Sequence, residues 1–269
     1  VSAPRRMGLP GELRAVRAGK TQMTLLKTEN LCKAFGSLQV TRDVNLSVAA
    51  GERHVIIGPN GAGKTSLVHQ LTGQLQPTSG RVLFKGVDIT GAKPDLICQM
   101  GVGRTFQKNN LFRSLTVQEN VRLAVQAKKG GWYECLRGVG IRTAQHERTD
   151  EILEQIQLTH DLHRPVSSLS YGEQRQLEVA IALAAEPQLL LLDEPTSGMS
   201  PAETDRMIDL VRSLPATLAL LMIEHDMKVV FSLADTVTVM YYGEVLASGT
   251  PQDIQGNARV REVYLGGKH

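Results

Sequence analysis

Residues 58–65 read Gly58-Pro59-Asn60-Gly61-Ala62-Gly63-Lys64-Thr65, a G-x-x-x-x-G-K-T pattern. Glycines at these positions allow backbone N–H groups to curl around phosphate oxygens at a helix N-terminus, where the helix dipole favours an anion. The lysine is suited to neutralising β- and γ-phosphate charge, and the threonine hydroxyl to ligating Mg²⁺. A strand-like stretch at residues 54–57 precedes the pattern and a helical run at 66–71 follows it. This context predicts a phosphate-binding loop rather than an ordinary glycine-rich turn.

A second stretch, residues 189–192, consists of four leucines and is followed by Asp193 and Glu194. A buried strand that ends in this way places a carboxylate at the C-terminal edge of a parallel sheet, where open α/β folds bind ligands. Asp193 is suited to holding Mg²⁺ there, and Glu194 to orienting or deprotonating an attacking water. An apolar run with two acids is by itself a common strand end. Together with residues 58–65 it predicts a nucleotide-hydrolysing site.

A third stretch, Leu169-Ser170-Tyr171-Gly172-Glu173-Gln174, opens a helical run that extends to about Ala185. Ser170 and Glu173 have the spacing of a capping box, so one interpretation is simply a well-capped helix. The other interpretation adds an anion site made by the Ser170 hydroxyl and free N–H groups near Gly172. The two interpretations are compatible with each other.

The order of the predicted elements indicates an α/β fold. The chain is β-rich from Thr24 onwards, and residues from about 95 to 185 show helical patterns without strand signals. Apolar strands then alternate with helices, and continuous apolar strands of this kind are typical of a parallel sheet buried on both faces. The strands are expected at residues 25–28, 44–48, 54–57, 81–84, 189–192, 218–223 and 237–240, and the helices at 66–71, 117–127, 148–158, 202–214 and 227–233.

Composition excludes several classes of protein. The chain has 269 residues, of which 42% are hydrophobic and 21% charged, as in ordinary globular proteins. Its apolar runs fall far short of the roughly 20 residues that a helix needs to cross a membrane. The cysteines, Cys32, Cys98 and Cys135, show neither metal-ligand spacing nor a C-x-x-C pair. We therefore expect reduced cysteines that serve as packing residues.

The basic character of the chain comes from residues 1–22. The whole chain has a formal net charge of +3, and this segment contributes five basic residues against one acidic residue, so the remainder carries −1. We interpret the segment as a basic N-terminal extension, disordered or part of a mis-started leader, with a basic arm for a membrane surface or nucleic acid as the alternative. Residues 23–269 are expected to form the folded body, and its charge indicates no nucleic-acid partner.

These segments together resemble the ATP-binding subunits of ABC transporters. Residues 58–65 resemble the Walker A motif, residues 189–194 the Walker B motif, and residues 169–174 the LSGGQ signature with Tyr171 and Glu173 as substitutions. Gln107 in Arg104-Thr105-Phe106-Gln107 matches the Q-loop, and His225 in Ile223-Glu224-His225-Asp226 matches the switch histidine. The order and spacing agree from about residue 24 to 250.

The resemblance implies a P-loop NTPase fold. It has a RecA-like core with a mostly parallel sheet, an N-terminal antiparallel β subdomain and a helical subdomain inserted at about residues 95–180. All three parts belong to one ABC ATPase domain, residues 23–269. The cofactors implied by the resemblance are ATP and Mg²⁺.

The resemblance also assigns roles to individual residues. Catalysis is expected from Glu194, His225 and Gln107, and Mg²⁺ binding from Thr65, Gln107 and Asp193. Phe35 lies where the family places an aromatic side chain that stacks on adenine. The other residues expected to bind the nucleotide are Gly58, Pro59, Asn60, Gly61, Ala62, Gly63, Lys64, Thr65, Ser66, Ser170, Gly172 and Glu173. Ser200 stands near the place of the usual D-loop aspartate, and its contact across subunits stays open beside a helix-capping role.

In this family, two ATP-binding domains pair head-to-tail, with ATP between Lys64 of one and Ser170 of the other. The resemblance therefore implies a second ATP-binding subunit, identical or related, together with transmembrane permease subunits and, indirectly, a solute-binding protein. It places the chain peripherally on the cytoplasmic face of the inner membrane. Residues 104–121, 191–204 and 223–227 are similar to the branched-chain amino acid uptake type.

Two groups of alternatives stay open. ATPases of urea and lipopolysaccharide transport systems are similar, and the transported solute does not touch this subunit. A non-transport ABC ATPase that acts in DNA repair, on ribosomes or in cluster assembly is a different class. Repair members carry long coiled coils and translation members two nucleotide domains, and this sequence shows neither.

Overall fold

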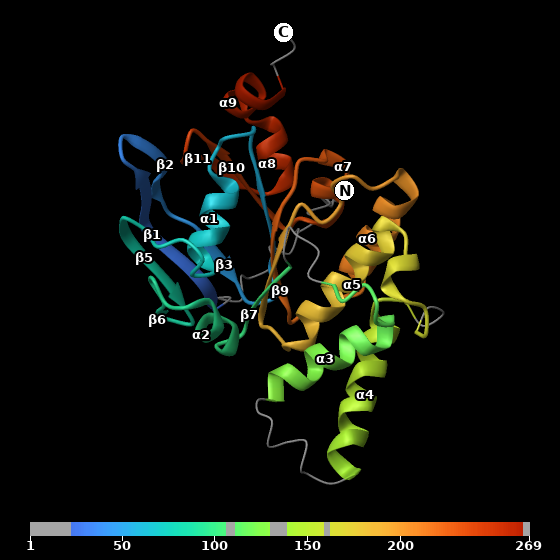
Figure 1. The fold of residues 1–269 in the computed structure, drawn as a ribbon. Helices are drawn as coiled ribbons and strands as arrows, with labels where there is room; N and C mark the ends of the chain where they lie inside the picture. The colour runs from blue at the N-terminus through green and yellow to red at the C-terminus, as the bar shows by residue number, and fades with distance from the viewer. Residues whose placement is uncertain (1–22, 106–110, 130–138, 159–161, 266–269) are drawn as a thin grey trace, which may run out of the picture.

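A computed structural model describes residues 23–105, 111–129, 139–158 and 162–265. Two β-sheets and the helices around them form layers, with α1 (Lys64–Leu71) between the sheets (Figure 1). The predicted α/β class is confirmed, as is the combination of an antiparallel N-terminal sheet with a mostly parallel second sheet.

The antiparallel sheet has the strand order β2-β1-β5-β6, and β3 pairs with β1. Its strands are β1 (Thr24–Phe35), β2 (Leu38–Val44), β3 (Ser47–Ala49), β5 (Ser79–Phe84) and β6 (Val87–Asp88). The expectation of a single strand over residues 44–48 is wrong. The Thr28 hydroxyl donates to Val44 O and accepts from Leu46 N, both at 2.8 Å, so one side chain of β1 occupies the break between β2 and β3.

The second sheet has the order β11-β10-β4-β9-β8-β7. The strands β4 (Arg53–Ile57), β7 (Val102–Arg104), β8 (Leu189–Asp193), β9 (Ala219–Ile223) and β10 (Thr236–Tyr241) are parallel, and β11 (Glu244–Gly249) is antiparallel to β10. Every residue of β8 and β9 is buried, which confirms the expectation of strands covered on both faces.

The strand β7 corrects the expectation that residues 95–185 contain no strand. It pairs in parallel with β8, with Val102 opposite Leu189 and Arg104 opposite Leu191. Three residues are too few to show a period of two, and Gly103 has low strand propensity. Tertiary contact explains the glycine, because a Cβ there would lie 3.0 Å from Pro187 Cβ.

Helices cover both faces of the parallel sheet. On one face, Leu67 and Leu71 of α1 pack in the same apolar core as Ile56 of β4 and Phe84 of β5. The opposite face packs against a second core that includes α5, α6 and α7. The helices are α2 (Pro94–Gln99), α3 (Val117–Lys129), α4 (Val139–Gln155), α5 (Tyr171–Ala184), α6 (Pro201–Ser213), α7 (Met227–Leu233), α8 (Pro251–Gly256) and α9 (Ala258–Val260). Within the described ranges, no helix combines the length and apolarity required to span a bilayer.

Candidate functional site

The loop between β4 and α1 is held tightly by its neighbours. A Cβ added to Gly58 would lie 2.3 Å from Met240 O, and one added to Gly63 would lie 2.3 Å from Val40 O. Gly63 has φ 95° and is the N-cap of α1, which no side chain of the described residues caps. The first-turn N–H groups of α1 are therefore available to an anion, as the sequence predicts.

Two cavities meet at this loop. The first, about 200 Å³, is lined by Val40, residues 60–66 and Glu194. The second, about 450 Å³, is lined by residues 58–60, Glu194, His225 and Val263. Asn60 and Glu194 line both cavities. The structure thus brings the phosphate-loop residues together with two of the predicted catalytic side chains.

The Lys64 side chain reaches back to the loop that precedes α1. Its side chain is buried, and Nζ donates to Gly58 O at 2.7 Å and to Pro59 O at 3.0 Å. Burial lowers the pKa of the Lys64 ammonium, and the nearby carboxylates of Glu194 and Asp193 act in the opposite direction. The loop carbonyls therefore hold the cation next to the first cavity.

Asp193, the last residue of β8, is 3% exposed. Its Oδ2 lies 3.2 Å from Arg104 Nη2, whereas its Oδ1 has no hydrogen-bond partner among the described residues. Burial raises the pKa of Asp193, and Arg104 opposes that shift. A buried oxygen without a partner is unfavourable unless a bound group satisfies it. Oδ1 therefore fits a ligand position for a hard cation such as Mg²⁺.

Glu194 follows directly and has a backbone conformation that is rare for a side-chain-bearing residue, with φ 48°. Its N–H donates to Ile223 O at 3.0 Å, which ties the end of β8 to the end of β9. Backbone strain of this kind persists where surrounding structure enforces it, often at functional sites. Here it accompanies a carboxylate that lines both cavities.

His225 is exposed and is the second residue after β9. Its backbone N–H donates to Glu224 Oε2 at 3.1 Å. Glu224 itself is fully buried, and burial raises its pKa while hydrogen bonds from Thr196 and His225 lower it. The predicted switch histidine thus borders the second cavity, and a buried carboxylate holds its backbone.

The signature segment is built as a capped helix start. Ser170 is the N-cap of α5 and forms a complete capping box with Glu173. The expectation of free N–H groups near Gly172 is wrong for Gly172 itself, whose N–H donates to Glu203 Oε1 at 3.1 Å. The reason is tertiary, because the start of α6 packs against the start of α5, where a Cβ on Gly172 would lie 2.7 Å from the same oxygen.

In the structure, Ser170, Gly172 and Glu173 line neither of the two cavities at the phosphate loop. A single chain therefore keeps its signature segment out of its own phosphate-loop cavities.

Ser200 caps α6 in a second complete capping box, with Glu203, which confirms its predicted capping role.

One predicted residue stands outside this arrangement. Phe35 is 53% exposed near the end of β1, with Lys33 Nζ 4.8 Å from the centroid of its ring, and it lines neither cavity. Gln107 lies outside the described residues. The exposure of Phe35 shows that this aromatic side chain is not a core residue.

Sequence reasoning missed several residues around the site. Val40 and Val263 line the cavities, and Arg104 pairs with Asp193. A continuous run of four leucines drew attention to Asp193, whereas Arg104 follows only Val102 and Gly103, which do not read as an apolar strand. The two valines carry no such signal, since tertiary packing alone brings them to the loop.

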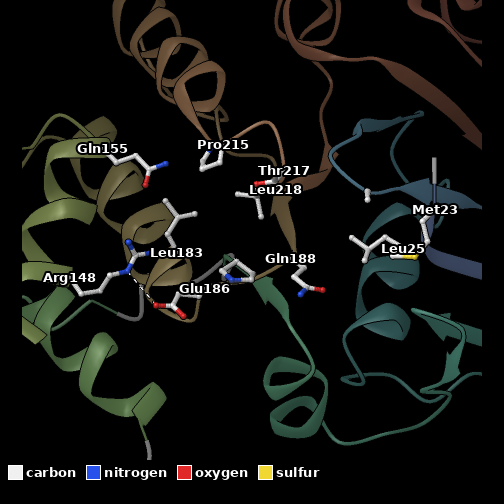
Figure 2. Close-up of a pocket in the computed structure, with 12 residues that line it drawn as sticks. Met23, Leu25, Arg148, Gln155, Leu183, Glu186, Gln188, Pro215, Thr217 and Leu218 are labelled. Atoms are coloured by element: carbon white, nitrogen blue, oxygen red, sulfur yellow. Dashed lines mark ion pairs between the residues drawn. The ribbon is translucent and has the colours of Figure 1, made fainter. Parts of the chain in front are cut away.

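The largest of the cavities described here, about 500 Å³, lies elsewhere (Figure 2). It is lined by Gln188 just before β8, by Leu25 and by Leu218, so it lies at the amino ends of the parallel strands. Arg148 and Glu186 form an ion pair at 3.5 Å on one side of it. Open α/β folds bind ligands at the carboxyl ends of the strands, which is where the phosphate loop and Asp193 lie.

The parallel sheet, the phosphate loop and the two acids at the carboxyl end of β8 define a P-loop nucleotide hydrolase. More specifically, this chain belongs to the ABC transporter family and is an ABC-type ATPase: the family model "ABC transporter" matches residues 41–197. A second model, "Branched-chain amino acid ATP-binding cassette transporter", matches residues 244–269.

Curated relatives and solved structures agree with this assignment. The chain is 40% identical over 249 residues to the high-affinity branched-chain amino acid transport ATP-binding protein LivG of Escherichia coli (strain K12), covering 90% of this chain and 98% of LivG. It is 38% identical to the corresponding protein BraF of Pseudomonas aeruginosa, with the same coverage. The ADP conformation of MJ1267, an ATP-binding cassette of an ABC transporter, matches with a TM-score of 0.80 and 31% identity over 91% of this chain and 99% of that one.

Proposed function

We propose that this chain is the ATP-hydrolysing subunit that powers an ABC importer for branched-chain amino acids or a related small polar solute. The observation that carries the proposal is the convergence of the phosphate loop, Glu194 and His225 on two adjoining cavities. The relatives that share 38–40% identity are named for branched-chain amino acid transport. The match of the C-terminal residues 244–269 to a branched-chain amino acid cassette model supports the same solute class.

Nucleotide binding would begin at the amino end of α1. The uncapped N–H groups there and the Lys64 ammonium are suited to the β- and γ-phosphates. Lys64 now donates to two carbonyls of its own loop, so phosphate oxygens would replace these acceptors. The remaining contacts to the phosphates would come from residues 58–66. The exposed ring of Phe35 would stack on adenine.

Magnesium would be held by the Thr65 hydroxyl and by Asp193, with Gln107 as a further ligand. The unpartnered Oδ1 of Asp193 supports this assignment, and Thr65 lines the first cavity. Among the residues that the structure describes, no three acidic, histidine or cysteine side chains form a group that could hold a metal ion. Thr65 and Asp193 nevertheless suit Mg²⁺, which is usually bound by one or two protein groups plus substrate phosphates and water. When bound, the ion would neutralise phosphate charge.

Hydrolysis would depend on Glu194 and His225. The Glu194 carboxylate lines both cavities, so it can orient or deprotonate a water placed beside the γ-phosphate. His225 would contact the γ-phosphate from the second cavity. Positioning and charge stabilisation by these groups are the main requirements of phosphoryl transfer.

A second ATP-binding subunit, identical or related, would complete the site. Ser170, Gly172 and Glu173 line neither phosphate-loop cavity of their own chain. In a head-to-tail pair, they would face the nucleotide bound to the partner, and ATP would join the two subunits.

Transmembrane permease subunits would dock near the segment that contains Gln107. Thr105 and Leu111, which flank this segment in the sequence, line a cavity of about 160 Å³ together with residues that include Cys98, Gly103, Ile181 and Ala182. This lining is mainly apolar and joins the end of β7 to α5, so a partner segment with apolar side chains would fit it. Such docking would place the chain peripherally on the cytoplasmic face of the inner membrane, where a solute-binding protein would act indirectly through the permease. No nucleic-acid partner is expected.

The test of the ATPase assignment is Glu194→Gln. This variant should bind ATP and form stable dimers but fail to hydrolyse, because Gln keeps the shape and loses the base. Lys64→Ala should weaken ATP binding instead. Nucleotide binding by a fluorescent ATP analogue, dimerisation by light scattering and phosphate release distinguish the two. Normal phosphate release by Glu194→Gln would refute the assigned role.

The solute assignment is tested by co-purification of the full chain from its native membranes. Recovery of permease subunits that carry out branched-chain amino acid uptake in vesicles supports it. Recovery of urea or lipopolysaccharide transport subunits, or salt-sensitive binding to nucleic acid, would overturn it.

A further inference from the structure

Glu224 is a fully buried carboxylate next to His225 in the chain, and the mechanism above gives it no role. It is the first residue after β9, and its backbone N–H donates to Ile56 O of β4 at 3.2 Å. Its side chain lies between the end of β9 and the segment that follows β8. A charged group buried this deeply requires hydrogen-bond partners for both oxygens.

The two oxygens of Glu224 bind two different segments of the chain. Oε1 accepts from Thr196 N at 3.2 Å and from Thr196 Oγ1 at 2.7 Å, and Oε2 accepts from His225 N at 3.1 Å. Thr196 is itself buried and lies two residues after Glu194. One carboxylate therefore links the backbone of the predicted switch histidine to the turn that carries the predicted general base.

A carboxylate is the side chain that this geometry requires. Donors approach both of its oxygens, and the donor at each oxygen includes a backbone N–H that cannot turn away. An amide of the same shape has only one oxygen, so its NH₂ group would face one of these N–H groups. A buried donor left without an acceptor is unfavourable, and the segment that carries it would shift.

We infer that Glu224 is a positioning residue that fixes His225 and the Glu194–Thr196 turn relative to each other, so that both active groups face the second cavity. This inference rests on the proposed function, because it assumes that Glu194 and His225 act on the same γ-phosphate. Glu224 does not touch the nucleotide in this account. Its effect on turnover passes through His225 and Glu194.

The first test compares Glu224→Gln with the wild-type chain. We expect kcat to fall about tenfold, while the KM for ATP changes less than twofold, because the phosphate loop is untouched. A matched control is Glu52→Gln, which alters a partly buried carboxylate that also accepts from a backbone N–H, Ala49 N at 2.6 Å, and contacts His54 at 3.0 Å. Glu52 precedes β4 at the end of the strand away from the phosphate loop, so kcat of this variant should stay within twofold of wild type.

The second test is a double-mutant cycle with His225→Ala, measured under single-turnover conditions. Because Glu224 acts partly through His225, Glu224→Gln should lower the rate by a smaller factor in the His225→Ala background, where only the effect through the Glu194–Thr196 turn remains, than in wild type. The inference would be overturned if Glu224→Gln lowered the rate by the same factor with and without His225. A wild-type kcat in Glu224→Gln would also overturn it. Thr196→Val keeps the carboxylate and removes only the 2.7 Å hydrogen bond, so it gives the same comparison if Glu224→Gln does not fold.

A spectroscopic readout separates positioning from general loss of stability. The imidazole resonances of His225 in an NMR spectrum should shift in Glu224→Gln or Thr196→Val and stay unchanged in Glu52→Gln. Unchanged resonances in all variants would overturn the inference. Failure of the proposed function looks different: wild-type protein would then bind no ATP, or Glu194→Gln would hydrolyse ATP normally, whatever the Glu224 variants do.

Discussion

Arg104 Nη2 lies 3.2 Å from Asp193 Oδ2, and this ion pair joins the carboxyl ends of two neighbouring parallel strands. Both side chains are almost completely buried, at 7% and 1% exposure. The same guanidinium donates to Gln74 Oε1 at 2.5 Å and to Thr72 Oγ1 at 3.3 Å, in the segment after α1. One arginine therefore connects three elements around the predicted magnesium ligand.

Replacement of Arg104 by Met should lower the free energy of unfolding by about 3 kcal/mol, because it leaves the Asp193 carboxylate buried without its counter-charge. Urea denaturation followed by circular dichroism measures the loss. The matched control is Arg42→Met, which breaks the pair of Arg42 with Glu244 at 3.0 Å, where both side chains are about half exposed. That change should cost less than about 1 kcal/mol. Equal losses in the two variants would contradict the importance of burial.

Gly63→Ala should weaken binding of an ATP analogue by at least about tenfold and destabilise the fold, because the new methyl group would lie 2.3 Å from Val40 O at φ 95°. The phosphate loop would have to move away from β2 to relieve the contact. Fluorescence titration and urea denaturation measure the two effects.

The comparison variant for this prediction is Gly86→Ala. Gly86 also has positive φ, 77°, but nothing lies within 4 Å of an added Cβ. Backbone strain alone should cost about 1–2 kcal/mol, with no change in nucleotide affinity. If Gly63→Ala binds the analogue as the wild type does, close packing does not set the shape of the loop.

Glu203 should contribute stability that depends on pH. The backbone N–H and hydroxyl of Ser200, followed by the N–H of Gly172, lower the pKa of the Glu203 carboxyl from 4.5 to about 2. Because the folded chain binds this proton less readily than the unfolded chain, the stabilisation is present above pH 4.5 and is lost as the pH falls towards 2. The urea midpoint of wild type should therefore exceed that of Glu203→Gln most at neutral pH, and the difference should shrink between pH 4.5 and 2. A difference that is constant with pH would contradict this prediction.

Local patterns were sufficient for much of the fold. The phosphate loop is a contiguous pattern whose glycines and lysine act within one turn, and the burial of β8 and β9 follows from their continuous apolar runs. Capping by Ser170 and Ser200 was equally readable, because a capping box depends on residues only three positions apart. Short β7 was missed because three residues carry no period.

The sequence by itself determined which chemical groups this chain offers: Lys64 at a helix N-terminus, Asp193 and Glu194 after a buried strand, and His225 after another. Only the tertiary structure decided what surrounds them. It joins Arg104 to Asp193 across 89 positions of sequence and Thr196 to Glu224 across 28, and it occupies the Gly172 N–H with Glu203. The physical reason is that hydrophobic patterning specifies which strands are buried, whereas contacts between side chains at neighbouring strand ends depend on sheet order and register.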